Sequence, residues 1–191
     1  MKYYLIIILI QFPFFLKAQS KVVDSKQTSL TKIQKENHLK VEIRAIKDNF
    51  NRINSIKKWS KITTYETDDS TEGGFINYYY LNEILEKILV RKFGESGQYL
   101  AEYYFANNNL SFVYEKDTKY NAPLYWKEYD AKKDESDEKR FYLYDEQLIQ
   151  VIHDKKIVRN DSSFIKQKNT LYSDLKEILK WSKMAKEGIN N

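Results

Sequence analysis

The spacing of the apolar residues changes at Trp59, and this change constrains the fold more than any other feature of the sequence. From Lys26 to about Ser60, apolar residues recur every three or four positions, with polar residues between them. This is the period of an α-helix with one apolar face. Neither Pro nor Gly interrupts residues 20–71, so we predict one long amphipathic helix, or two helices that meet near Asn37. The residues expected to pack this helix on a sheet are Leu30, Ile33, Leu39, Ile43, Ile46, Phe50, Ile53 and Ile56.

Beyond Trp59 the sequence consists of runs rich in Tyr, Phe, Ile and Val, separated by short polar breaks. Such runs predict β-strands, and breaks this short can join only antiparallel neighbours. The breaks also carry the Gly, Asn or Asp that tight turns require. We therefore predict an antiparallel β-meander of about six or seven strands. The strands are expected at residues 61–66, 75–81, 84–93, 98–106, 110–116, 140–144 and 147–152.

Three of the predicted hairpins share one sequence plan. In residues 79–85, 104–110 and 142–148, an aromatic strand end is followed by Asn or Asp at the turn and by Leu three residues later. The spacing between the three copies is unequal, whereas a solenoid repeats at a constant period, so we expect hairpins of one sheet. The plan resembles the short aromatic hairpin repeats of the MORN type, without their regularly placed glycines. The resemblance is confined to the hairpin and implies no function.

Two further segments complete the predicted architecture. Within residues 116–140, Pro123 and the charged run 130–139 predict a loop. Residues 169–187 return to the apolar spacing of a helix, and Gly188 follows as a stop. The chain is therefore predicted to have an α+β fold, in which a long N-terminal helix and a C-terminal helix pack on the antiparallel meander.

Residues 1–18 have the order of a secretory signal peptide. Met1-Lys2 is a short positive start, and the apolar run Tyr3–Leu16 precedes Ala18, a small residue suited to cleavage. The run is shorter than the roughly 20 residues that a membrane-spanning helix needs. We therefore predict cleavage after Ala18 and a single mature domain, residues 19–191, secreted or periplasmic and without a stable membrane anchor. The chain has no cysteine, which excludes disulfides, thiolate metal sites and a lipid-carrying cysteine.

The sequence presents no recognisable catalytic or metal-binding constellation. The two histidines, His38 and His153, have no partner of suitable type nearby in the sequence, so we expect both to be solvated. The acidic segments 68–72 and 134–138 and the glycines of 94–97 are expected in turns or loops, not in cation or phosphate sites. Basic residues alternate with acidic ones along the chain, which disfavours nucleic acid as a partner. We predict no cofactor and no metal.

The aromatic strands suggest a binding surface. Consecutive residues of a strand point to opposite faces of the sheet, so helices that cover one face would leave Tyr79 and Tyr104 partly exposed on the other. We therefore predict a non-enzymatic domain that binds a protein, peptide or glycan through the exposed face or edge of its aromatic sheet, with Tyr79 and Tyr104 as the candidate ligand-binding residues. An inhibitor of a secreted enzyme is one special form of this hypothesis. The alternatives are a structural envelope component and a hydrolase, such as a glycosidase, whose carboxylates assemble in space. The candidate carboxylates are Glu66, Glu86, Glu102 and Glu115.

Overall fold

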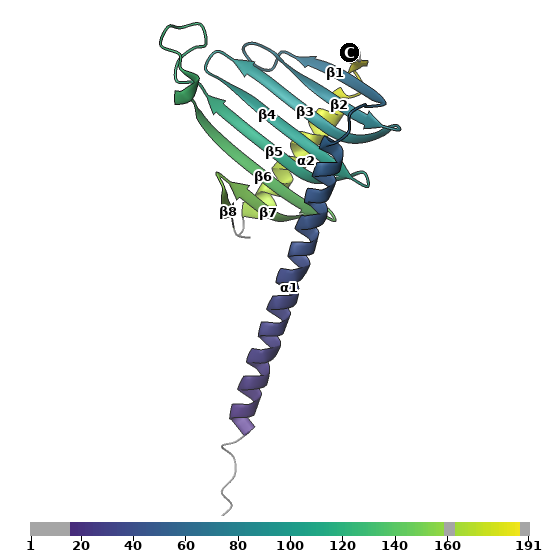
Figure 1. The fold of residues 1–191 in the computed structure, drawn as a ribbon, viewed down its shortest axis with the longest axis vertical. Coiled ribbons are helices and arrows are strands. Elements are labelled where there is room, and N and C mark those ends of the chain that lie inside the picture. Colours follow the sequence, from purple (N-terminus) through teal and green to yellow (C-terminus); the bar gives the residue numbers. More distant parts are fainter. Residues whose placement is uncertain (1–15, 159–162, 188–191) are drawn as a thin grey trace, which may run out of the picture. The chain divides into compact units, whose positions relative to one another are not determined.

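The computed structural model describes residues 16–158 and 163–187 and shows an α+β fold (Figure 1). The chain divides into two units, Met1–Val41 and Glu42–Asn191, and the boundary falls within helix α1, Leu16–Asn54. All strands and the second helix belong to the second unit, and every contact described below lies within it.

The predicted signal peptide, residues 1–18, lies outside the described residues except for its last three, which begin α1. Cleavage after Ala18 and the domain boundary at residue 19 therefore stay predictions. Among the helices of the described ranges, none is long and apolar enough to span a membrane.

Within the described residues, nine strands form one antiparallel sheet. The strands are β1 Lys61–Thr67, β2 Gly74–Leu81, β3 Ile84–Gly94, β4 Gly97–Ala106, β5 Asn109–Lys119, β6 Glu135–Tyr144, β7 Gln147–His153, β8 Lys156–Val158 and β9 Lys186–Glu187. Strands β1 to β8 lie side by side in chain order, and β9 pairs with the outer edge of β1. The predicted meander is confirmed, with eight strands instead of six or seven. Strands β8 and β9 are too short to show a periodic pattern in the sequence.

Four hairpins close with two-residue turns in which both residues have positive φ. Two successive positive φ values define a type I′ turn, whose twist matches that of the strands on either side. Asn and Asp adopt this left-handed conformation more readily than other non-glycine residues, which explains why one of them begins each turn. The turns are Asn82-Glu83, Asn107-Asn108, Asp145-Glu146 and Asp154-Lys155.

A β-bulge follows the turn in each of the three hairpins that share the sequence plan. In β3 the register passes from Leu85 to Lys87, which leaves Glu86 without a partner in β2. Ser111 in β5 and Ile149 in β7 are left out of the register in the same way. All three copies of the plan therefore fold alike, with the hairpin turn that was predicted and a bulge that was not.

The loop between β3 and β4 is a tight turn of Glu95 and Ser96, since Gly94 and Gly97 already pair with each other. A Cβ atom at Gly97 would lie 2.3 Å from the carbonyl oxygen of Thr118 on the neighbouring strand. Glycine is needed at this position because no side chain fits between the two backbones.

Helix α2, Ser163–Trp181, covers one face of the sheet and forms the main core with it (Figure 1). The Tyr78 hydroxyl donates a 2.6 Å hydrogen bond to the carbonyl oxygen of Ile178, and Tyr65 stacks on Trp181 at 5.7 Å between ring centroids. The helix side chains buried in this core are Phe164, Leu171, Leu175 and Ile178. The strand residues buried with them are Ile76, Tyr78, Ile88, Val90, Ala101, Tyr103, Phe105, Leu110, Val113, Phe141, Leu143 and Val151.

The C-terminal part of α1, from Glu42 onwards, packs on the opposite face. Ile46 and Ile53 are buried there in a second, smaller core. The strand residues of this core are the alternate ones, Tyr104, Phe112 and Tyr142, as expected from the two-residue period of a strand. Each face of the sheet therefore has its own helix and its own core.

Several predicted boundaries were wrong. Residues 135–139 of the charged run lie in β6 and not in a loop, because they pair with β5 and place opposite charges side by side, as in Lys116 with Glu138. Helix α1 is continuous past Asn37 and ends at Asn54, before the predicted end near Ser60. Helix α2 lies six residues earlier than predicted, since residues 186–187 form β9 instead. Gly188 lies outside the described residues.

Candidate functional site

The first of the two predicted ligand-binding tyrosines, Tyr104, is buried under α1. Its exposed fraction is 1 %, and its ring lies 4.9 Å from that of Phe50 and 5.8 Å from that of Phe112. The hydroxyl contacts Asn54 Oδ1 at 3.2 Å and Glu102 Oε2 at 3.1 Å, and burial raises its pKa. The expected partial exposure of Tyr104 is therefore wrong, because the last turns of α1 cover the residue.

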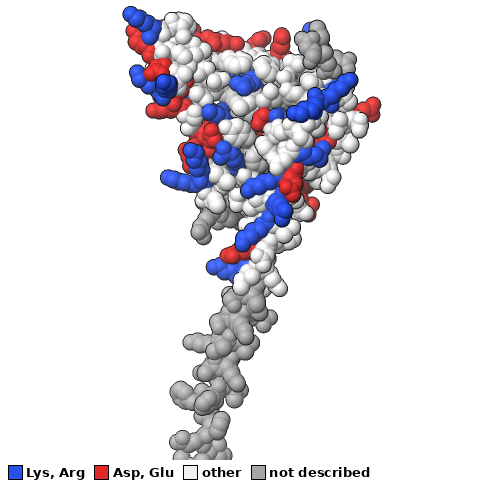
Figure 2. Space-filling view, viewed as in Figure 1, with Lys and Arg blue, Asp and Glu red and all other residues white. Residues whose placement is uncertain are grey.

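The second predicted tyrosine, Tyr79, is half-buried on the same face of the sheet. Its ring lies 5.3 Å from that of Trp59, and its hydroxyl accepts a 3.4 Å hydrogen bond from Asn77 Nδ2. Basic and acidic side chains are mixed on the side of the molecule that Figure 2 shows. Because Tyr79 is only half-buried, part of its side chain is accessible, and its role in binding stays a prediction.

The four candidate carboxylates do not form one acidic site. Glu66 is exposed on β1, where it lies opposite Phe75 of β2. Glu86 is bound by Arg52, and Glu102 accepts a 2.6 Å hydrogen bond from Lys87 Nζ, so a cation neutralises each. Glu115 lies opposite Ala101 in the register, on the other face of the sheet, towards α2. The arrangement of these acids therefore lends no support to a glycosidase.

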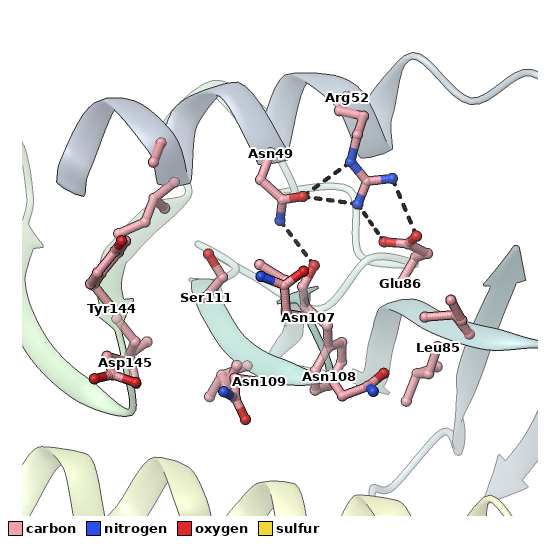
Figure 3. A pocket seen from close by; sticks show the side chains of 17 residues that line it. Asn49, Arg52, Leu85, Glu86, Asn107, Asn108, Asn109, Ser111, Tyr144 and Asp145 are labelled. Carbon is pink, nitrogen blue, oxygen red and sulfur yellow. Dashed lines mark hydrogen bonds and ion pairs between the residues drawn. The ribbon is translucent and has the colours of Figure 1, made fainter. Parts of the chain in front are cut away.

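A groove of about 1020 Å³ crosses the end of the sheet where the three bulged hairpins turn, beneath α1 (Figure 3). In Figure 3, Arg52 and Glu86 lie at one end, Tyr144 and Asp145 at the other, and Asn107–Asn109 between them. The hairpins lie in chain order across the sheet, so their three turns lie side by side at the same end of the strands. The groove is lined from α1 by Ala45, Ile46, Asn49 and Arg52, and from the hairpins by residues 84–86, 105–111 and 143–145.

A chain of hydrogen bonds holds α1 against the hairpins and fixes one wall of the groove. Asn49 Nδ2 donates to the carbonyl oxygen of Phe105 at 2.9 Å, and Asn49 Oδ1 accepts from Arg52 Nη2 at 2.9 Å. Arg52 then donates to both carboxylate oxygens of Glu86, at 3.2 and 2.6 Å. The bulge in β3 makes this possible, because it turns Glu86 towards α1 beside Lys87. The wall is therefore pre-formed.

The floor of the groove combines amide groups with apolar side chains. Asn107, Asn108 and Asn109 are all exposed, so their side chains offer hydrogen-bond donors and acceptors to solvent. Ile84 and Tyr144, on the flanking hairpins, are also exposed. A row of amides between two apolar side chains suits a ligand that alternates polar and apolar groups.

A second exposed feature is the loop between β5 and β6. At its tip Leu124, Tyr125 and Trp126 are 45 %, 68 % and 56 % exposed. Asn121 braces the base of the loop, because its Nδ2 donates to the carbonyl oxygen of Glu128 at 3.0 Å and its Oδ1 accepts from the backbone of Asp130 at 2.9 Å. The loop thus presents three large apolar side chains to solvent.

The face covered by α2 holds a partly buried acid, Glu115. Burial raises its pKa, the charges of Asp174 and Asp137 add to the effect, and Lys139 and a hydrogen bond from Tyr99 oppose it. Near this acid, His153 is exposed, as predicted, and its ring contacts Asp137 of the neighbouring strand.

Sequence reasoning missed the groove because its lining comes from α1 and three separate hairpins. The repeated hairpin plan was the signal in the sequence that could have located the groove, since alternate turns of one meander lie at the same end of the strands. Comparisons of the chain with protein-family models, with curated proteins and with solved structures find no match.

Proposed function

We propose that this protein is a non-enzymatic binding domain that holds an extended segment of a protein or peptide in the groove across its three hairpin turns. The observation that carries the proposal is the exposed amide row of Asn107–Asn109, set between Ile84 and Tyr144. An extended peptide presents donors and acceptors along its backbone, and an Asn side chain can pair with either.

The dimensions of the groove fit such a ligand. Neighbouring hairpins are two strands apart, or about 10 Å, so the three turns extend over roughly 20 Å. A fully extended peptide covers about 3.3 Å per residue, so roughly six residues would cross the groove. The pre-formed wall of Asn49, Arg52 and Glu86 reduces the ordering that binding requires.

The groove chemistry favours binding over catalysis. Both oxygens of Glu86 are engaged by Arg52, so this carboxylate acts as a structural partner of α1. The signal-peptide order of residues 1–18 supports a place of action outside the cytoplasm, in the periplasm or beyond the cell. Tyr79 lies outside the groove lining and would serve only a ligand that extends further over the sheet.

The experiment is a selection of random hexapeptides on the immobilised full-length protein, run in parallel with a glycan array. We expect enriched peptides, and at least tenfold weaker binding of them by Asn109→Ala and by Tyr144→Ala. Tyr125→Ala is the control, because it removes an exposed tyrosine that lies outside the groove, in the β5–β6 loop. Peptides that bind the groove variants as tightly as the parent protein would contradict the proposal, as would binding of glycans alone.

A further inference from the structure

Three metal-ligating side chains converge at the opposite end of the β6–β7 hairpin from the groove. Asp137, His153 and Asp154 each offer one ligand atom, and these atoms all lie within 4.8 Å of one another. The strand register explains the convergence. Lys139 pairs with His153, Asp137 lies two residues before Lys139 on the same face, and Asp154 begins the turn into β8.

Each carboxylate of the cluster is held through one oxygen and turns the other towards His153. Asp137 Oδ2 lies 3.1 Å from Lys139 Nζ, while Asp137 Oδ1 contacts His153 Nε2. Asp154 Oδ1 accepts a 3.1 Å hydrogen bond from the backbone of Glu138, while Asp154 Oδ2 lies 3.6 Å from His153 Nε2. Partners that orient ligands in this way are a regular feature of metal sites in proteins.

The surroundings of the cluster carry an excess of negative charge. Glu115 is partly buried on the same face, and Asp137 and Asp174 both act electrostatically on it, with Lys139 as the opposing cation. Glu115 thus lies near two further carboxylates, those of Asp137 and Asp174. A bound cation would relieve the repulsion among them.

We propose that Asp137, His153 and Asp154 bind a divalent transition-metal ion, and that Zn²⁺ fits this ligand set best. Zn²⁺ accepts imidazole nitrogen and carboxylate oxygen at about 2.0–2.2 Å in tetrahedral geometry, so ligand atoms lie about 3.3 Å apart. The 3.6 Å separation of Asp154 Oδ2 and His153 Nε2 is close to this value. Asp137 Oδ1 is in direct contact with His153 Nε2, so the ion would replace this contact and move the two atoms apart. The cluster faces solvent, so water can supply the fourth ligand. Ca²⁺ fits poorly, because it takes six to eight oxygens.

The bound ion would join β6, β7 and the β7–β8 turn, and so stabilise an edge of the sheet that otherwise depends on the short strand β8. This inference is independent of the proposed peptide groove, which lies at the other end of the hairpin. No metal was predicted from the sequence, because sixteen positions separate Asp137 from His153 and only the pairing of β6 with β7 brings them together.

The test is a calorimetric titration of the full-length, chelator-treated protein with ZnCl₂. We expect saturable binding of one ion at this cluster, and affinity at least tenfold lower in Asp137→Asn and in His153→Gln. His38→Gln is the matched control and should leave this binding unchanged. If the variants bind Zn²⁺ as tightly as the parent protein, or if the parent shows no saturable binding at this site, the proposal is wrong.

A second measurement does not depend on the variants. In protein labelled with ¹⁵N at histidine, added Zn²⁺ should shift the ring nitrogen resonances of His153 and leave those of His38 in place. Equal shifts of both histidines, or a shift of His38 alone, would overturn the proposal.

Discussion

Arg52 and Glu86 form a two-point hydrogen-bonded ion pair that joins α1 to the bulge of β3. The Glu86 side chain is 11 % exposed, whereas the Arg52 side chain is 48 % exposed, so the carboxylate depends on the arginine more than the arginine depends on it. Paired donors on a planar guanidinium also fix the orientation of the carboxylate. The pair therefore determines how the last turns of α1 lie over the hairpins.

Replacing Arg52 with Met should destabilise the protein by about 2 kcal/mol, because Glu86 would keep its charge without a partner. The double variant Arg52→Met with Glu86→Leu should recover much of this loss, since no buried charge remains. Urea unfolding of the four proteins in the cycle measures both effects. Arg44→Met, at an exposed position of the same helix, is the control. A loss no greater for Arg52→Met than for this control would refute the assigned role.

The buried Tyr104 and the half-buried Tyr79 should respond differently to truncation. Tyr104→Ala removes the ring that Phe50 and Phe112 pack against, and it should cost about 3–5 kcal/mol. Tyr104→Phe keeps the ring and should cost only about 1 kcal/mol, for the hydroxyl contacts to Asn54 and Glu102. Tyr79→Ala should cost clearly less than Tyr104→Ala. Denaturant midpoints measure all three, and equal losses at the two alanine sites would show that the assignment of the α1 core is wrong.

The β5–β6 loop should become more mobile when the hydrogen bonds of the Asn121 side chain are removed. Asn121→Ala deletes the bonds to the backbones of Glu128 and Asp130, so hydrogen exchange across residues 121–134 should accelerate. Trp126→Ala, at the exposed tip, should change the stability by less than about 0.5 kcal/mol. Unchanged exchange in Asn121→Ala would mean that other contacts hold the loop.

Glu115 should make the stability fall as the pH rises. Its pKa in the folded protein lies above the ordinary value of 4.5, mainly because of burial, so the folded state holds the proton more tightly than the unfolded state. The resulting stabilisation is complete below the unfolded pKa and is lost as the pH passes through the folded pKa. Glu115→Gln should therefore become more stable relative to the parent protein as the pH rises above 4.5, the ordinary pKa of the group. Parallel stability curves for the two proteins would contradict this assignment.

The meander was predictable because its signals are local. Asn or Asp at each turn, followed by Leu three residues later, determines a type I′ hairpin from about seven residues of sequence. Strands β8 and β9 escaped prediction because their pairing depends on neighbours that are already in place. The start of β6 was not predicted for another reason. Its run of charges is typical of a loop, and only the facing residues of β5 show that it forms a strand.

The candidate site was less predictable than the fold because it depends on how α1 lies on the sheet. Alternation places Tyr79 and Tyr104 on one face, but only the packing of Phe50 over Tyr104 decides which of them is covered. The bulge at Glu86 also breaks the expected alternation, because it turns two consecutive residues, Glu86 and Lys87, to the same face of the sheet. Neither feature follows from the period of the strands.

The chain order of the strands also has a kinetic consequence. From β1 to β8 every pairing joins consecutive strands, so most of the sheet can form by closing short loops, at little cost in chain entropy. The pairing of β9 with β1 and the bond from Tyr78 to Ile178 instead join distant parts of the chain. These contacts must close late. From this topology we expect the meander to form first and the docking of α2 and β9 to be the slow step of folding.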